Sequence, residues 1–422
     1  MKIKQLALGI VSIFFIMGIN SSYAQETTES DSSKITLTQV LQSNRYSIGY
    51  DKQGLTGEGG QWLRQKAREA TIVSLGEMHL TKEIPAMMTA LMKELQRADE
   101  FDYLAIEASP WTTEQMTKEL RKGKTAYDDC IRQYPFAVPF DNFENERDLL
   151  LQALKGNKHE DPLWGLDQMF AFATKQALDR LEDLASADNA RDAIQKVRKA
   201  GKDKSADDPR LKKHSTGITT PISAFDSTTF DTLRSYFAGN SEAQAIIEEL
   251  SHSITIYRTN DTDNYRSNQL RAQYLRDNLR THVRKAQQSK ETPQILVKMG
   301  ARHIYRGMTP NNALDIGNLT VSLARGMGGE ALNVAILCGP NSRMAAFPTR
   351  EVKCSPGDLN DSLKTLIQDQ AVLFDLSEVH QKLHEGAFEP NAKLKNFLWG
   401  FDAVVLIPNA TPAKPIFTSG KK

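Results

Sequence analysis

The chain has 422 residues, of which 40% are hydrophobic and 25% are charged, a composition that suits one large core or two smaller ones. Its net charge of +1 gives no reason to expect nucleic acid or an anionic membrane as the main partner, so we expect a small-molecule substrate or ligand. The cysteines Cys130, Cys338 and Cys354 are too few for a disulfide scaffold and allow at most one internal bridge. Cys338 ends an apolar strand pattern, which favours a small buried core residue over a nucleophile.

The first residues have the pattern of a secretory signal peptide. Lys2 and Lys4 give a short basic start, residues 6–19 are apolar, and residues 22–24 form a small-residue cleavage site. The apolar run is shorter than the ~20 residues of a membrane span, so we expect no stable span after cleavage. The mature protein is predicted to be exported, periplasmic or secreted, with residues 25–34 as a disordered lead-in.

The chemistry of the chain is organised around residues 70–80, which read ATIVSLGEMHL. A mostly apolar run ends in a glycine and then places Glu77 and His79 two positions apart, which is typical of a buried strand that runs out into a loop. A second strand pattern, residues 101–107, finishes on Glu107, and a helical pattern lies between the two. Such a βαβ unit has parallel strands, usually neighbours, so Glu77, His79 and Glu107 are expected at one edge of the sheet.

The middle of the chain changes character. A third strand pattern, residues 163–166, ends at Asp167. From residue 168 to about 289 helical patterns dominate, which predicts a helical insertion over the active edge of the sheet. Residues 294–299 return to a buried strand that ends in Gly-x-x-His303.

The last part of the chain is predicted to complete the sheet. Strand patterns are found at residues 319–323, 333–337, 371–374 and 403–407. Helical patterns are sparse here, so hairpins or antiparallel strands are expected. The predicted fold is α/β: one domain over residues 35–422 with a central, mainly parallel sheet, flanking helices, a helical insertion and antiparallel strands towards the C-terminus.

Two histidines and two carboxylates at strand ends can supply hydrolytic chemistry. Histidine is the natural base for activating water, and a carboxylate on its other ring nitrogen fixes the tautomer. We therefore expect His79 as general base, Glu77 or Glu107 as its orienting carboxylate, and His303 as a donor to the developing oxyanion. Alternatively, Glu77, His79, Glu107 and His303 are candidate ligands for a divalent zinc or manganese ion. No Gly-x-Ser-x-Gly elbow is present, which argues against a serine nucleophile.

The candidates for substrate binding are Trp111, Asp167, Arg271 and Asn278. Trp111 would either contact substrate or staple the start of its helix. Arg271 and Asn278 are seven positions apart in a helical pattern over residues 263–288 and so share nearly one face, where they would bind substrate or pair with neighbouring helices. The irregular aromatic segment 134–140 is expected to add an apolar wall to a pocket.

In their order along the chain, these motifs resemble those of the erythromycin esterase-like proteins. The resemblance runs from about Trp62 to Pro415 and is carried by Gly76-Glu77-x-His79, Glu107, Trp164-Gly165-Leu166-Asp167, the helix with Arg271, Leu275, Asn278 and Leu279, Gly300-x-x-His303, and the ending GFDAVVLIP at residues 400–408. It implies a hydrolase that cleaves an ester or lactone bond with water activated by His79, and commits to no cofactor. It also implies that the Arg271 face borders the site.

Two alternatives follow from the same resemblance. The superfamily includes haem-binding uptake and Tiki-type proteins, and the step from Glu77 to His79 resembles these branches more than the Gly-Glu-x-x-His of the esterases. One alternative is a non-enzymatic protein that binds haem or another ligand, for which the histidines could be joined by Met78, Met87, Met88 and Tyr103. The other is a metal-dependent peptidase of the Tiki type.

Overall fold

The computed structural model describes residues 35–205, 225–346, 350–354, 363 and 365–417. The predicted signal peptide, residues 1–24, and the predicted lead-in, residues 25–34, lie outside the described residues. Of the helices in the described part of the chain, none combines the length and the apolar character that crossing a bilayer requires.

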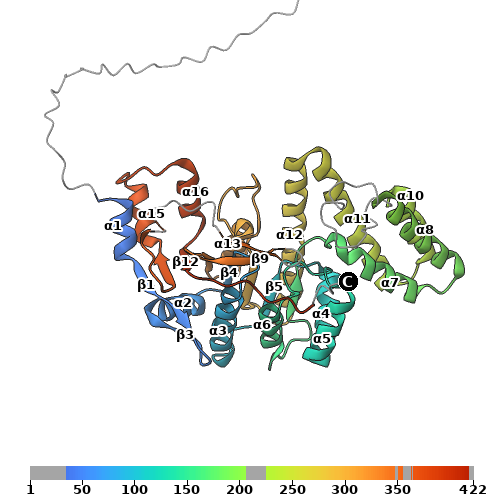
Figure 1. Ribbon diagram of the computed structural model, residues 1–422, viewed down its shortest axis with the longest axis horizontal. Coiled ribbons are helices and arrows are strands. Elements are labelled where there is room, and N and C mark those ends of the chain that lie inside the picture. The colour runs from blue at the N-terminus through green and yellow to red at the C-terminus, as the bar shows by residue number, and fades with distance from the viewer. Residues whose placement is uncertain (1–34, 206–224, 347–349, 355–362, 364, 418–422) are drawn as a thin grey trace, which may run out of the picture. The chain divides into compact units, whose positions relative to one another are not determined.

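A single large sheet runs through the centre of the molecule (Figure 1). Within the described residues, its eight strands follow the order β1-β11-β12-β8-β4-β7-β5-β6. From β12 to β6 all neighbours pair in parallel, whereas β11 is antiparallel to both β1 and β12. The predicted α/β fold is therefore confirmed, including the antiparallel pairing towards the C-terminus. The strands of this sheet are β1 (Arg45–Ser47), β4 (Ile72–Glu77), β5 (Tyr103–Ile106), β6 (Leu163–Gly165), β7 (Ile295–Gly300), β8 (Ala331–Cys338), β11 (Val372–Asp375) and β12 (Ala403–Ile407).

Strands β4 and β5 are parallel, but they are not neighbours, contrary to the usual arrangement of a βαβ unit. Strand β7 lies between them and pairs with both, with Glu77 opposite Gly300 and Ile106 opposite Lys298. Every residue of β7 is buried, as expected for a central parallel strand covered on both faces. Because β7 lies between β4 and β5, its end is directly between the ends of these two strands.

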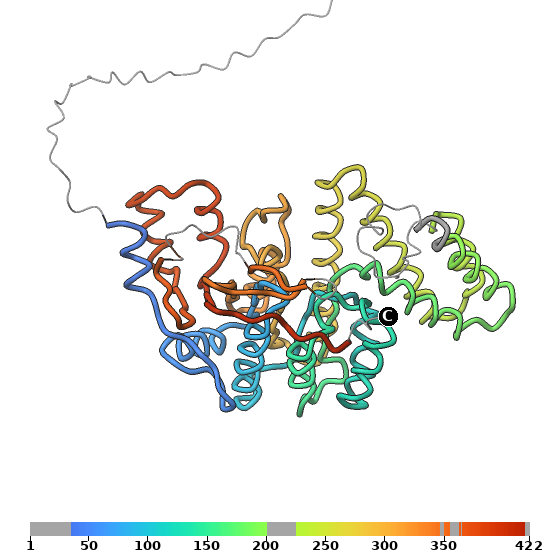
Figure 2. Tube along the Cα trace, viewed as in Figure 1, coloured from blue at the N-terminus to red at the C-terminus, as the bar shows by residue number. Residues whose placement is uncertain are grey.

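Helices cover both faces of the sheet and give three layers, which Figure 2 follows along the chain. One face packs against α2 (Gly57–Glu69), α3 (Glu83–Arg97), α4 (Pro110–Lys122), α5 (Lys124–Gln133) and α6 (Glu144–Leu154). The other face packs against α1 (Leu37–Ser43), α12 (Asn264–Gln287), α13 (Ile316–Gly326), α15 (Ser377–His384) and α16 (Ala392–Gly400). Two short pairs, β2 (Gly49–Tyr50) with β3 (Leu55–Thr56) and β9 (Arg343–Ala346) with β10 (Arg350–Lys353), stand outside the large sheet.

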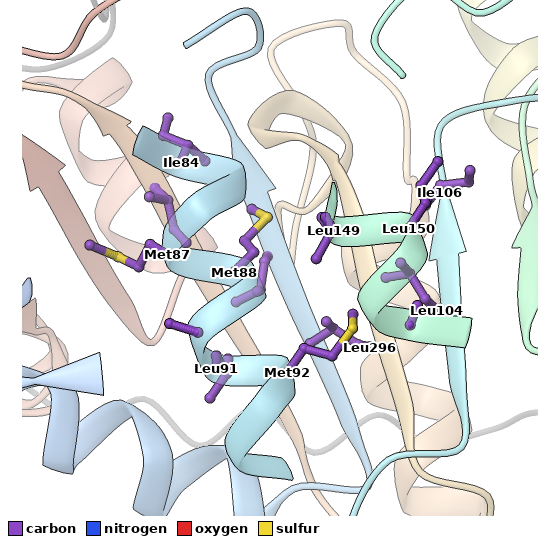
Figure 3. Close-up of a cluster of buried hydrophobic side chains, with 14 of the residues drawn as sticks. Ile84, Met87, Met88, Leu91, Met92, Leu104, Ile106, Leu149, Leu150 and Leu296 are labelled. Atoms are coloured by element: carbon purple, nitrogen blue, oxygen red, sulfur yellow. The ribbon is translucent and has the colours of Figure 1, made fainter. Parts of the chain in front are cut away.

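Helix α3 shows how the sequence directs this packing. Its apolar residues recur every three or four positions and form one stripe, which includes Ile84, Met88, Leu91 and Leu95. Figure 3 shows this stripe facing side chains of β5, β7 and α6. Full burial of each such side chain stabilises the fold by about 1.5–3 kcal/mol, so the α3 face anchors the helix that follows the Glu77 loop.

The described residues between β6 and β7 are helical, as predicted. Helices α7 (Thr174–Leu184), α8 (Asp188–Ser205), α10 (Ser227–Tyr236) and α11 (Ser241–Thr262) follow a 3-10 turn, η1 (Ala171–Ala173). They contribute most of a hydrophobic cluster separate from the two clusters that flank the sheet. Helix α12 then packs against the sheet and returns the chain to β7.

The strand predicted at residues 319–323 is wrong, because these residues belong to helix α13. The alternation of apolar residues there suggested a strand, but the buried positions Ile316, Thr320 and Ala324 are four apart, which is a helical spacing. Asp315 begins the helix, since its side chain accepts a hydrogen bond from the Ile316 N–H at 2.8 Å. With α15 and α16, helices are also more frequent in this region than predicted.

Candidate functional site

The predicted catalytic residues converge at the carboxyl ends of the central parallel strands. Glu77 is the last residue of β4, Glu107 follows β5 directly, and His303 closes η3 (Ala301–His303), the turn after β7. Glu77, Glu107 and His303 are buried, while His79 in the loop after β4 keeps 20% of its side chain exposed. This is the edge where open α/β sheets bind their ligands.

Carboxylates and imidazoles alternate across this site. His79 Nδ1 donates to Glu77 Oε1 at 2.8 Å, and His79 Nε2 lies 3.4 Å from Glu107 Oε2. On the other side of Glu107, His303 Nε2 lies 3.5 Å from Oε1, and His303 Nδ1 donates to Asp315 Oδ2 at 2.7 Å. Both ring nitrogens of each histidine therefore face a carboxylate.

This alternation favours the charged form of every member. Burial alone would lower the pKa of His79, but the carboxylates of Glu107 and Glu77 outweigh it and raise that pKa to about 9. In the same way, Glu107 and Asp315 overcome burial and raise the pKa of His303 to about 10. Burial opposes ionisation of Glu107, yet His303 and His79 hold its pKa well below the usual range.

Lys298, which the sequence analysis did not identify, supports Glu77 from within β7. Its Nζ donates to Glu77 Oε1 at 2.6 Å and lies 3.0 Å from Glu146 Oε2 of α6, and all three side chains are at most 3% exposed. Burial alone would raise the pKa of Glu77, but Lys298 and His79 outweigh it and lower that pKa to about 2. Burial raises the pKa of Glu146 to about 8. Lys298 therefore keeps Glu77 ionised while Glu146 is held mainly in its neutral form at pH 7. A lone lysine in an otherwise apolar strand was the available signal.

Glu107 is held by two further donors. Arg271 Nη2 donates to Glu107 Oε1 at 2.8 Å, and the Gly300 N–H donates to Oε2 at 2.7 Å. The same guanidinium donates two hydrogen bonds to Asp167, from Nε at 2.9 Å and from Nη2 at 2.5 Å. A glycine is required at position 300 because the His79 ring lies close to the backbone there: a Cβ would lie only 2.7 Å from His79 Nε2.

The four residues predicted to bind substrate do not behave alike. Asp167 and Arg271 lie at the site and line a cavity beside Glu107. Asn278 instead donates to the Leu166 carbonyl at 2.8 Å and so secures the end of β6. Trp111 is buried in the cluster of the helical insertion, where its backbone N–H donates to Glu249, and it does not line this cavity.

The cavity beside Glu107 has a volume of about 250 Å³. Its polar lining includes Glu107, Asp167 and Arg271, and its apolar lining includes residues of the segment 134–140, as predicted. Phe140 of that segment also stacks on His79, with ring centroids 3.7 Å apart and ring planes 4° from parallel. The cavity therefore adjoins His79 through Glu107 and Phe140. Its other lining residues are Ala108, Ser109, Ala137, Pro139, Gln168, Phe170 and Tyr257.

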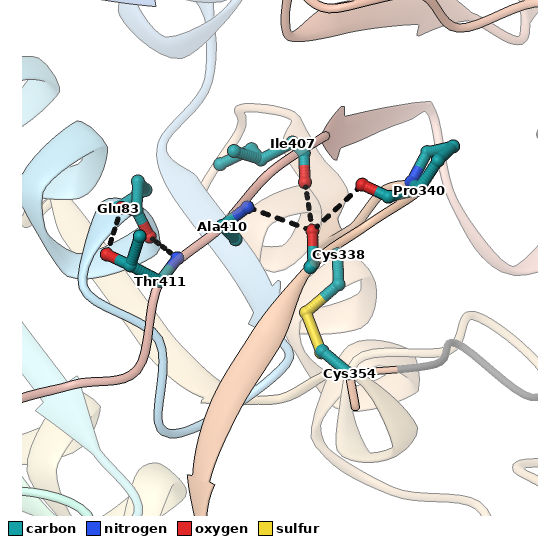
Figure 4. The surroundings of a disulfide bond; sticks show 8 residues. Glu83, Cys338, Pro340, Cys354, Ile407, Ala410 and Thr411 are labelled. Carbon is teal, nitrogen blue, oxygen red and sulfur yellow. Dashed lines mark hydrogen bonds between the residues drawn. A yellow bond between two sulfur atoms is a disulfide. The ribbon is translucent and has the colours of Figure 1, made fainter. Parts of the chain in front are cut away.

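A disulfide supports the loop that carries His79. Figure 4 shows that Cys338, the last residue of β8, is bonded to Cys354 after β10. Cys130 is the remaining thiol. Between the two cysteines, the Ala345 N–H of β9 donates to the Leu80 carbonyl at 2.9 Å. Leu80 follows His79 and has a φ of 71°, a conformation that needs such support in a non-glycine residue. The prediction that Cys338 is buried is confirmed, and it forms the one internal bridge that the sequence allowed.

The candidate metal and haem ligands are engaged in other contacts in this arrangement. Among the described residues, no group of three or more His, Cys, Asp or Glu side chains is arranged to hold a metal ion. The imidazole nitrogens of His79 and His303 face carboxylates, so coordination of a metal ion would require one of these contacts to be displaced. Met87 and Met88 are buried in the core beneath α3 and cannot reach a ligand at this edge (Figure 3).

Asp315 is the second functional residue that the sequence analysis missed. One of its carboxylate oxygens caps α13 and the other binds His303 Nδ1, so the start of that helix orients the histidine. The signal was an aspartate just before an apolar helical stripe, which the incorrect strand prediction for residues 319–323 concealed.

Comparisons with known proteins support the fold. A scan against models of protein families finds no match, and neither does a sequence search of curated proteins. Three solved structures share 14% sequence identity with this chain: a Bacillus cereus protein (TM-score 0.55, covering 90% of this chain and 98% of its own), a succinoglycan biosynthesis protein (0.56, 89% and 97%), and a histidine-to-asparagine variant of the erythromycin esterase EreC in its open conformation (0.51, 85% and 95%). The chain therefore has the fold of an erythromycin esterase, which confirms the predicted resemblance at the level of fold.

Proposed function

We propose that this protein is an exported hydrolase that cleaves an ester or lactone bond with a water molecule activated by His79. The observation that carries this function is the placement of His79 between Glu77 and Glu107, with His303 on the far side of Glu107. A base, its orienting carboxylate and a cationic donor thus meet at one edge of the sheet, beside a cavity.

The first step belongs to His79. In its neutral form the ring keeps its proton on Nδ1, because Glu77 Oε1 accepts it at 2.8 Å, and this leaves the Nε2 lone pair as the base. Nε2 takes a proton from water while the water oxygen bonds to the ester carbonyl carbon. The imidazolium that forms lies between two carboxylates, which stabilise it.

His303 is suited to the negative charge that develops on the carbonyl oxygen. Its imidazolium is held by Asp315 at Nδ1, so its Nε2–H is available to the oxyanion once substrate displaces the long contact with Glu107 at 3.5 Å. When the tetrahedral intermediate collapses, the bond to the leaving oxygen breaks and His79 Nε2 returns its proton to that oxygen. The products are a carboxylic acid and an alcohol, or a hydroxy acid from a lactone.

Glu107 and Arg271 position these groups rather than react. Glu107 lies between both histidines, and the Arg271 and Gly300 donors fix its two oxygens. Because its pKa is held well below the usual range, Glu107 is a poor base at neutral pH. Its role is to stabilise the imidazolium of His79.

Export of the mature protein is part of the proposed function and is supported by residues 1–24 alone. We expect a small-molecule substrate and no nucleic-acid partner, because the net charge of the chain is +1.

The test is hydrolysis of simple esters by the purified mature protein and by His79→Ala. General-base catalysis contributes about 10²–10⁴-fold, so we expect kcat to fall by that factor in a variant that remains folded by circular dichroism. His159→Ala is the matched control, because His159 also binds a carboxylate, Asp102 at 3.1 Å, but lies outside the site.

Two outcomes would overturn the proposed function. One is a folded His79→Ala variant with unchanged turnover, and the other is a folded wild-type protein that hydrolyses no ester or lactone. A chelator is expected to leave activity unchanged, because the proposed mechanism uses no metal ion: His79 activates the water and His303 stabilises the oxyanion.

A further inference from the structure

The cavity beside Glu107 restricts the substrate by size. Its volume of about 250 Å³ lies below the ~300–1,000 Å³ of sites that enclose drug-sized molecules. The cavity has an apolar lining, which consists of Ala137, Pro139, Phe140, Phe170 and Tyr257. A compact hydrocarbon group fits such a space, whereas a macrocyclic lactone does not.

The cavity also has a charged part in its lining and adjoins His79. Glu107, Asp167 and Arg271 belong to the lining, and Glu107 and Phe140 both contact His79. A group that fills the cavity therefore lies close to His79. The cavity acts as a subsite next to the reacting atoms.

The charges at the site restrict the substrate further. Each cation is already paired: Arg271 with Asp167 and Glu107, His303 with Glu107 and Asp315. Lys298 and His79 are paired with Glu77 in the same way. An anionic substrate finds no unpaired cation here, and a cationic one would have to compete with the guanidinium and imidazolium groups that already bind these carboxylates. An uncharged substrate requires neither an unpaired cation nor the displacement of an existing one.

We infer, resting on the proposed function, that the substrate is an uncharged ester whose acyl or alcohol part is a compact apolar group that fills this cavity. Ala137 and Phe170 contribute to the apolar lining of the cavity and are expected to set its size limit. Neither residue takes part in the hydrogen bonds of the catalytic side chains.

The experiment measures kcat/KM by pH-stat for two series of esters. Methyl alkanoates vary the acyl chain and alkyl acetates vary the alcohol, both up to twelve carbons. In the series whose variable part occupies the cavity, each added methylene should raise kcat/KM about fourfold until the cavity is full. Longer chains should then fall by at least tenfold. Monomethyl succinate, an anionic ester, should react at least tenfold more slowly than methyl butyrate.

Substitutions locate the limit. Phe170→Ala enlarges the cavity and should raise kcat/KM for the longest esters at least tenfold, with the shortest changed less than threefold. Ala137→Leu should shorten the longest accepted chain. Phe388→Ala is the control, because Phe388 is also partly buried but packs against the cluster on the other face of the sheet. It should leave the chain-length profile unchanged.

The outcomes separate the two hypotheses. Hydrolysis that is independent of chain length in both series, or a profile that folded Phe170→Ala leaves unchanged, would overturn the size limit while the hydrolase function stands. Equal rates for the anionic and neutral esters would overturn the charge restriction. Hydrolysis of no ester at all would remove the proposed function, and this inference with it.

Discussion

Replacing Lys298 by methionine removes the cation on which Glu77 depends. Lys298 Nζ lies 2.6 Å from Glu77 and 3.0 Å from Glu146, and the lysine side chain is only 3% exposed. Loss of one partner from a buried ion pair costs about 3–5 kcal/mol, because the remaining charge is left without compensation. Methionine is unbranched and of similar length, so the packing of the stem is largely preserved and the charge is the main change.

This loss should be visible in thermal unfolding. An unfolding entropy of about 2.1 cal/mol/K per residue over the roughly 390 residues from 35 to 422 gives about 0.8 kcal/mol/K. The free-energy loss then lowers Tm by about 4–6 °C in calorimetry. Lys290→Met is the control, since Lys290 also binds a carboxylate at 2.6 Å but is 40% exposed, and an exposed pair contributes at most about 1 kcal/mol.

A double-mutant cycle tests the cause. If Lys298 acts through Glu77, the double variant Lys298→Met/Glu77→Gln has no carboxylate left without its cation. Its loss of unfolding free energy should therefore be at least 1 kcal/mol smaller than the sum of the losses in the two single variants. Additive losses would refute the coupling. Equal Tm changes in Lys298→Met and Lys290→Met would refute the importance of burial.

Three further results are expected. First, kcat/KM should rise about tenfold per pH unit from pH 6 to about 9, because the neutral form of His79 is the base and its pKa is about 9; a flat profile would exclude His79 from that role. Second, the raised pKa values of His79 and His303 stabilise the fold fully below pH 6.5, and this contribution of a few kcal/mol is lost as pH rises through about 9 and 10, so urea unfolding should show lower stability at pH 10 than at pH 6.5. Third, replacing both Cys338 and Cys354 by serine should cost about 3 kcal/mol, because the bridge closes a loop with a sequence separation of 16, and kcat should fall with it; unchanged calorimetry would contradict this.

The local sequence pattern was sufficient to predict that the candidate catalytic residues converge. Glu77, His79, Glu107 and His303 each follow an apolar run, and parallel strands end at one edge, so their convergence follows from the fold class alone. Strand order did not follow, because β7 joins β4 and β5 from roughly two hundred residues further along the chain. Pairing over that distance leaves no mark on local periodicity.

The supporting residues could not be predicted for the same reason. Lys298 is visible as a lone charge in an apolar strand, but its partner Glu146 comes from α6, on a distant part of the chain. Phe140 could be assigned to an apolar wall, yet its stacking on His79 depends on how an irregular segment folds over the site. Asn278 and Trp111 are the opposite case, since they were predicted to bind substrate. Their helical positions were compatible with the site, but their contacts lie elsewhere.

The two histidines are chemically alike, and their surroundings assign them different roles. His79 has one short carboxylate contact, at 2.8 Å, and one long contact at 3.4 Å, and with 20% of its side chain exposed, against 8% for His303, it is the more accessible of the two. His303, fixed by Asp315 at 2.7 Å, stays protonated up to about pH 10. In the proposed mechanism the neutral form of His79 acts as the base, while the imidazolium of His303 lies between Glu107 and Asp315 and meets the oxyanion. Glu107 lies between the two histidines, where it stabilises the cationic form of both.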